Sequence, residues 1–138
     1  MKTLAFGKVG RCVILVCGKH PIDDASWDKY LWFLKGELIP GTRPVGLVYT
    51  EGAGPTVAQR QQANELITPV VGELKAAVLL SSNIARGIMT AMNWTNPVHS
   101  SFSQDDLDAA IAFIGIEEED IPKLKQKLAD LREEIHRP

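Results

Sequence analysis

The chain has 138 residues, of which 45% are hydrophobic and 23% charged, as expected for one globular domain. Its formal net charge of -2 argues against a nucleic acid as partner, because nucleic acids are bound by clustered basic side chains. The longest apolar run, residues 12–17, is too short to cross a bilayer, and the N-terminus lacks the continuous apolar stretch of a signal peptide. We therefore expect a cytoplasmic protein with no membrane span.

Two adjacent strands are predicted near the N-terminus. Residues 13–16 form a short aliphatic run without polar alternation, which is typical of a strand covered on both faces. Residues 6–9 are predicted to pair with it as an edge strand across a glycine-containing turn. The two cysteines, Cys12 and Cys17, then point to opposite faces of one strand, so we expect no disulfide.

A strand with a helix on each side of it follows along the chain. Asp23 or Asp24 is predicted to cap the first helix, whose apolar residues have the spacing of one helical face. These residues are Trp27, Tyr30, Leu31, Leu34 and Leu38. Residues 45–50 have the pattern of the next buried strand, and the Gly-Pro turn after it predicts a second helix at about residues 56–67.

The third and fourth strands are predicted at residues 76–80 and 98–102. Between them we expect a helix whose shared apolar face consists of Ile84, Ile88 and Met92. Ser103, with Asp106 three positions later, has the form of an N-terminal cap, and it predicts a helix that Gly115 ends. The apolar face of that helix consists of Leu107, Ile111 and Ile114.

Strands and helices thus alternate along the chain. Such alternation implies crossover connections and predicts an α/β fold, with a mainly parallel sheet of four to five strands and helices packed against it. We assign this single domain to residues 1–116. Residues 117–138 are predicted to form an extra, charged amphipathic helix with a narrow apolar seam over residues 121–135. This helix either packs on the domain or forms a homodimer contact.

The best candidate site is the loop Gly52-Ala53-Gly54-Pro55-Thr56, which joins a strand to a helix. Backbone amides and the helix dipole can hold an anion at such a place. However, the loop lacks the Gly-Lys-Ser/Thr ending of a phosphate-binding P-loop, and its proline removes one amide. The alternative is a tight turn in which Thr56 is an N-terminal helical hydroxyl.

A second loop is predicted at the same edge of the sheet. Ser81, Ser82 and Asn83 follow the third buried run, at the carboxyl edge where ligands gather in open α/β folds. Arg86, one helical turn later, offers a cation for an acidic group. Together with the first loop, these residues form a candidate site for a protein partner or an anion. The alternative is that the Ser and Asn side chains only cap a helix and that Arg86 is solvated.

We predict no catalytic site, no metal site and no cofactor. A nucleophilic enzyme needs Ser or Cys beside a His that an acid holds, and the spacing of His20, His99 and His136 does not predict such a group. The chain contains neither a His-x-x-x-His nor a Cys-x-x-Cys motif, which are common metal-ligand spacings. A hydrolase therefore ranks last among the functional hypotheses.

Three stretches, residues 45–55, 77–88 and 103–115, each combine a strand or helix pattern with the loop beside it. In this order they resemble the STAS fold of anti-sigma-factor antagonists and of STAS-like, SEC14-like stand-alone domains. The last stretch resembles the family's closing helix, with an acid, Leu and small residues before Gly. The resemblance implies a non-enzymatic regulatory domain that docks on another protein, often a kinase or a component of a signalling assembly. It also implies nucleotide or lipid binding in some relatives.

The sequence departs from this family at its phosphorylation motif. Anti-sigma-factor antagonists resemble one another in an Asp-Ser-Ser-Gly motif at the start of the second helix, where the partner kinase phosphorylates the first Ser. The matching stretch here is Gly52 to Thr56, in which Thr56 is the only hydroxyl. A phosphorylation switch is therefore absent, or it uses Thr56, Ser81 or Ser82.

Two functional hypotheses follow from these observations. The first is a STAS-like regulatory module that binds a protein partner through the Gly52 to Thr56 loop and the neighbouring helix surface. The second is a sensor or carrier of a small anionic ligand, nucleotide or lipid, with its crevice between that loop and residues 81–83.

Overall fold

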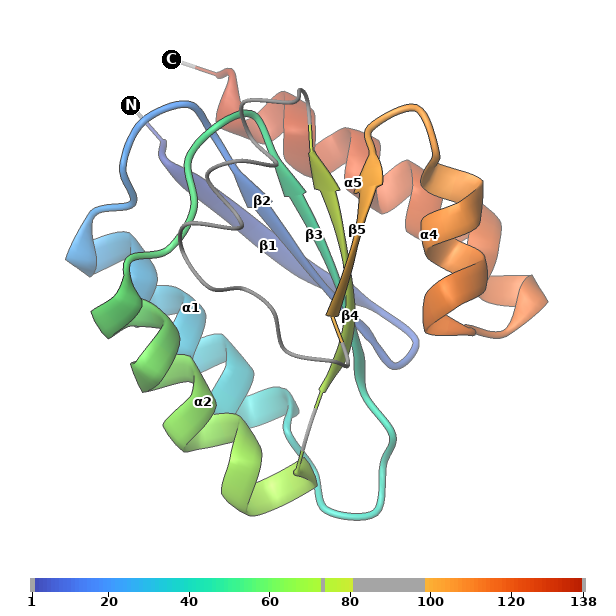
Figure 1. The fold of residues 1–138 in the computed structure, drawn as a ribbon, viewed down its shortest axis with the longest axis horizontal. Helices are drawn as coiled ribbons and strands as arrows, with labels where there is room; N and C mark the ends of the chain where they lie inside the picture. Colours follow the sequence, from blue (N-terminus) through green and yellow to red (C-terminus); the bar gives the residue numbers. More distant parts are fainter. Residues whose placement is uncertain (1, 73, 81–98, 138) are drawn as a thin grey trace.

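The computed structural model describes residues 2–72, 74–80 and 99–137. Its centre is a sheet with the strand order β1-β2-β3-β4-β5 (Figure 1). The strands are β1 (Leu4–Val9), β2 (Cys12–Cys17), β3 (Val45–Thr50), β4 (Lys75–Leu80) and β5 (His99–Ser103). β1 pairs with β2 in antiparallel orientation, and all the other pairs are parallel. The predicted α/β fold with a mainly parallel sheet is confirmed.

Helices cover both faces of this sheet. The helices α1 (Asp24–Glu37) and α2 (Val57–Val71) lie side by side on one face, the α1/α2 face (Figure 1). The helices α4 (Leu107–Ile114) and α5 (Ile121–Ile135), with the short 3-10 turn η1 (Glu118–Asp120) between them, lie on the other, the α4/α5 face. The fold therefore has three layers, with buried hydrophobic clusters on both sides of the sheet.

The strand β2 is buried on both faces, which explains why its sequence is apolar throughout. Cys12, Ile14 and Val16 point into the core under α4 and α5, whereas the residues between them point into the core under α1 and α2. Cys12 and Cys17 consequently lie on opposite faces, as predicted, and both are free thiols. Burial raises the pKa of each thiol to about 12, so both remain protonated at neutral pH.

The start of α1 is fixed by Asp23, as the sequence predicts. The carboxylate of Asp23 accepts hydrogen bonds from the backbone N–H of Ser26, at 3.0 Å, and from the hydroxyl of Thr3, at 2.6 Å. Because these bonds favour the ionised form, they lower the pKa of Asp23 to about 2. On the inner side of this helix, Trp27, Tyr30 and Leu34 are buried, as the helical spacing indicates.

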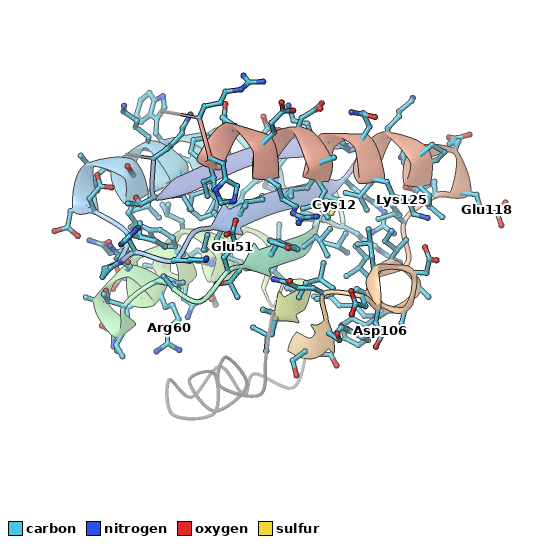
Figure 2. The ribbon with its side chains drawn as sticks, turned by 90° about the horizontal axis from the view of Figure 1, so that it is seen from above. Cys12, Glu51, Arg60, Asp106, Glu118 and Lys125 are labelled. Carbon is cyan, nitrogen blue, oxygen red and sulfur yellow. The ribbon has the colours of Figure 1, made fainter. Side chains whose placement is uncertain are left out.

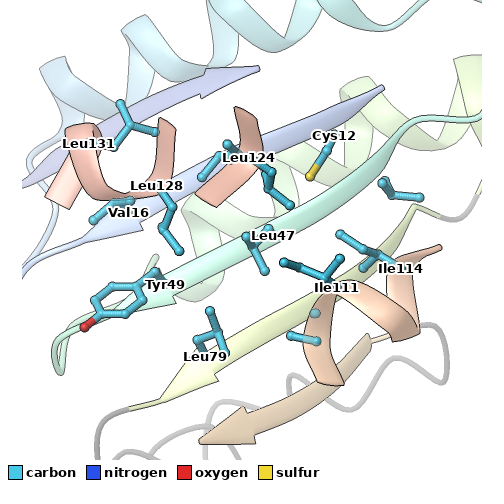
Figure 3. Close-up of a cluster of buried hydrophobic side chains, with 14 of the residues drawn as sticks. Cys12, Val16, Leu47, Tyr49, Leu79, Ile111, Ile114, Leu124, Leu128 and Leu131 are labelled. Carbon is cyan, nitrogen blue, oxygen red and sulfur yellow. The ribbon is translucent and has the colours of Figure 1, made fainter. Parts of the chain in front are cut away.

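The helix α5 completes the core on the α4/α5 face. Its apolar side chains point at the strands, next to those of α4 (Figure 3). The buried residues of α5 are Leu124, Leu128, Leu131 and Ile135. The sequence predicts that residues 121–135 either pack on the domain or form a homodimer contact, and in the structure they pack on the domain. A second copy of the chain cannot use the same side chains, because the sheet already covers them.

Two predicted helix boundaries differ from the structure. The helix α2 continues past residue 67 to Val71, with Pro69 inside its last turn. The predicted cap at Ser103 is wrong, since Ser103 is the last residue of β5 and α4 begins at Leu107. The backbone N–H of Gln104 still donates to the carbonyl of Leu80, at 3.1 Å, so strand pairing extends past the expected cap.

Candidate functional site

In the predicted Gly52 loop, the amides of Gly52 and Ala53 are engaged within the chain. The N–H of Gly52 donates to the Thr50 hydroxyl, at 3.1 Å, and that hydroxyl donates to the carbonyl of Ala53. The N–H of Ala53 donates to the carbonyl of Gly18, at 3.0 Å. Gly52 has a φ of 146°, a backbone conformation that residues other than glycine rarely adopt. These amides are therefore not available as a cradle for an anion.

Thr56 caps the helix α2 in a reciprocal arrangement with Gln59. The Thr56 hydroxyl accepts from the N–H of Gln59, at 3.1 Å, and the Gln59 side chain accepts from the N–H of Thr56, at 3.0 Å. This capping box confirms the alternative in which Thr56 is an N-terminal helical hydroxyl. The Thr56 residue is exposed, whereas Gln59 is buried.

Gln59 also joins α2 to α1. Its side-chain amide donates to the carbonyl of Ile22, at 3.0 Å, and its backbone carbonyl accepts from the indole N–H of Trp27, at 3.1 Å. The side-chain amide is costly to replace, because the carbonyl of Ile22 and the N–H of Thr56 would each lose a hydrogen bond. The two helices are thus held in one position relative to each other.

The second predicted loop follows β4, the strand that pairs with β3. Ser81, Ser82, Asn83 and Arg86, like the predicted helix that follows them, lie outside the described residues. The strands that precede the two loops do end together, because Thr50 of β3 and Leu80 of β4 are register partners. The expected proximity of the two loops stays a prediction.

A pocket of about 360 Å³ lies between the sheet and the helices α1 and α2. Two register rows of the sheet form its floor, with Val13, Gly46 and Ala76 in one and Leu15, Val48 and Val78 in the other. Its walls include Trp27 and Tyr30 of α1, Ala63 and Ile67 of α2, and Leu74. The pocket is therefore lined mainly by apolar side chains.

Small residues on two neighbouring strands make room for this pocket. Gly46 and Ala76 are register partners and line it, whereas Leu47 and Ala77 beside them point to the opposite face of the sheet. A methyl group at Gly46 would lie 3.1 Å from Cδ2 of Leu74, which is closer than ordinary packing allows. A side chain at position 46 would therefore require Leu74 to move by a few tenths of an ångström.

The helix α2 contributes three polar residues to the pocket lining. Arg60, Asn64 and Thr68 line it, and their spacing of four residues places them along one side of the helix. Figure 2 shows Arg60 on the side of the sheet away from α5. The Nε–H of Arg60 is buried and has no hydrogen-bond partner in the described part of the chain. Burial lowers the pKa of Arg60, although a guanidinium remains charged at neutral pH.

The opposite face carries a polar cluster at the end of β3. Glu51 is paired with His136, with 2.7 Å between the carboxylate oxygen and Nε2. The guanidinium of Arg132 lies over the ring of Tyr49, at 4.4 Å from its centroid. Burial raises the pKa of Tyr49. These contacts fasten the end of α5 to the strand that leads into the Gly52 loop, so we assign them a structural role.

Sequence reasoning missed the pocket and its polar residues. The available signals were the small residues Gly46 and Ala76 inside buried strand patterns, and the spacing of Arg60 from Asn64 in the predicted second helix. Neither signal identifies a pocket by itself, because small strand residues also allow close packing and exposed helix positions are often polar.

Comparisons with known proteins identify no relative of this chain: no family model, curated protein or solved structure matches. Within residues 2–72, 74–80 and 99–137, no three His, Cys, Asp or Glu side chains gather as a metal site. In the same part of the chain, no helix is long and apolar enough to cross a membrane.

Proposed function

We propose that this chain is a binding domain for a small, largely apolar ligand, which occupies the pocket between the sheet and the helices α1 and α2. The observation that carries this proposal is the pocket itself, whose volume of about 360 Å³ falls within the range of ligand sites. Apolar walls with a few convergent polar groups are the usual composition of such sites. The proposal moves the predicted ligand crevice from the loop at the sheet edge to the α1/α2 face.

The position of the pocket supports this function. Its lining comes from three strands and two helices, whose relative positions are held by strand pairing and by the hydrogen bonds of Gln59. A site built on regular elements is largely formed before the ligand arrives, so little conformational entropy is lost on binding. Binding is therefore expected to occur without rearrangement of the sheet.

A larger side chain that fills part of the pocket should weaken ligand binding. Ala63→Leu adds an isopropyl group to the wall of the pocket, and Ala58→Leu makes the same change at an exposed position of the same helix. We expect saturable binding of the neutral fluorescent probe N-phenylnaphthylamine by the wild type and by Ala58→Leu. Ala63→Leu should bind the probe at least about tenfold more weakly, which corresponds to about 1.4 kcal/mol.

The measurement is a fluorescence titration, with circular dichroism to confirm that each variant is folded. Equal affinity in both leucine variants would place the probe outside the pocket. A wild-type protein without saturable binding would contradict the proposed function.

We also propose, as a second candidate, the STAS-like regulatory module that binds another protein, such as a kinase or a component of a signalling assembly. The supporting observation is Val57, an apolar side chain that is 58% exposed directly after the exposed Thr56. A phosphate on Thr56 would lie at the N-terminus of α2, where the helix dipole favours negative charge. This surface is separate from the pocket wall formed by Arg60 and Ala63.

For this candidate, we expect the tagged chain to capture a stoichiometric partner from its native lysate, and Val57→Glu to lose that partner. Ile39→Glu is the matched control, because Ile39 is also an exposed large hydrophobic residue but lies after α1. Mass spectrometry of the captured chains and of phosphate on Thr56, Ser81 and Ser82 gives the readout. A partner that both variants retain would contradict docking beside Thr56.

A further inference from the structure

We propose that the ligand of the pocket is an acyl-chain carboxylate, whose chain lies against the apolar walls and whose carboxylate pairs with Arg60. This inference rests on the proposed function, and it adds the chemical class of the ligand.

The guanidinium of Arg60 lacks a hydrogen-bond acceptor at its Nε–H, and a carboxylate can be that acceptor. Its Nε–H is buried without a hydrogen bond, and no ion pair of the described residues includes Arg60. A buried N–H without a partner is destabilising. A carboxylate can accept from the Nε–H and from a terminal N–H together, which is a strong and directional contact.

The charge of the pocket matches a monoanion. Among the described residues that line the pocket, Arg60 is the only charged one, and the polar residues beside it on α2, Asn64 and Thr68, are neutral. A carboxylate carries one negative charge at neutral pH, whereas a phosphate monoester carries between about 1.5 and 2. A single guanidinium therefore compensates a carboxylate fully but a phosphate monoester only in part.

The walls favour an aliphatic body for this ligand. Six of the residues that line the pocket are branched aliphatic residues, namely Val13, Leu15, Val48, Ile67, Leu74 and Val78. Each methylene group that leaves water for such a surface is worth roughly a fourfold gain in affinity. Affinity should therefore rise with chain length until the pocket is filled.

The test is displacement of N-phenylnaphthylamine by decanoate and by decanol, which have the same chain but differ in charge. We expect the wild type to bind decanoate at least about tenfold more tightly than decanol, since hydrogen bonds to charged groups contribute more than neutral ones. Arg60→Gln should remove this preference for decanoate over decanol. Arg43→Gln, at an exposed position outside the pocket, should retain the preference.

Each outcome separates this inference from the proposed function. If the wild type binds the probe but does not distinguish decanoate from decanol, the role of Arg60 is overturned and the pocket proposal stands. Tighter binding of decyl phosphate than of decanoate would also overturn the assignment to a carboxylate. If the probe, decanoate and decanol all fail to bind, both proposals fail. The comparison of decanoate with decanol on the wild type needs no variant. It therefore tests the assignment to a carboxylate even if Arg60→Gln does not fold.

Discussion

Leu124→Ala is expected to lower the free energy of unfolding by about 2–5 kcal/mol, because it empties part of the core under α5. Leu124 is fully buried, and it packs in one cluster with Ile14 and Leu47 of the sheet and Ile111 of α4. The loss combines the transfer free energy of the removed methyl groups with the cost of the cavity left behind. Urea denaturation followed by circular dichroism measures this difference.

The control for this change is Lys123→Ala, which alters the preceding, exposed residue of the same helix. Its effect should stay within about 0.5 kcal/mol, as is usual at exposed positions away from special contacts. If the two variants were equally stable, α5 would not belong to this core. Its seam over residues 121–135 would then be free for a homodimer, which sedimentation of the wild type would detect.

Trp27→Ala should destabilise the other core by about 3–5 kcal/mol. The side chain of Trp27 is 2% exposed, and its ring centroid lies 5.0 Å from that of Tyr30. Its indole N–H donates to the carbonyl of Gln59, so the variant also leaves a buried acceptor without this donor. The change thus removes both apolar packing and a link between α1 and α2.

Trp32→Ala is the matched control, because it makes the same substitution in the same helix. Trp32 is 77% exposed, and its described contact is with the ammonium group of Lys35, 5.9 Å from the ring centroid. We expect a change within about 0.5 kcal/mol for this variant in thermal or urea unfolding. Comparable losses in Trp27→Ala and Trp32→Ala would contradict the orientation of α1 described above.

The order and type of most described helices and strands could be predicted from the sequence. The aliphatic run in β2 predicts a strand buried on both faces, and the spacing of Trp27, Tyr30 and Leu34 predicts the inner side of α1. Asp23 and Gly115 likewise act where the sequence places them, as a helix cap and as a left-handed stop. These features depend on residues within a few positions of each other, so local chemistry is sufficient to determine them.

The candidate site required the tertiary structure. Gly46 of β3 and Ala76 of β4 are 30 positions apart in the sequence, and only strand register brings them together below Arg60 of α2. The sequence pointed instead to the Gly52 loop, because a glycine-rich strand-to-helix turn resembles an anion site before its hydrogen bonds are known.

Likewise, the amphipathic pattern of α5 determined that its apolar seam would be buried. Only the tertiary structure shows that β1 and β2 are the strands against which this seam packs. Periodicity specifies which side of a helix avoids water, but many apolar surfaces satisfy that requirement equally well. The choice among these surfaces depends on contacts between residues that are distant along the chain.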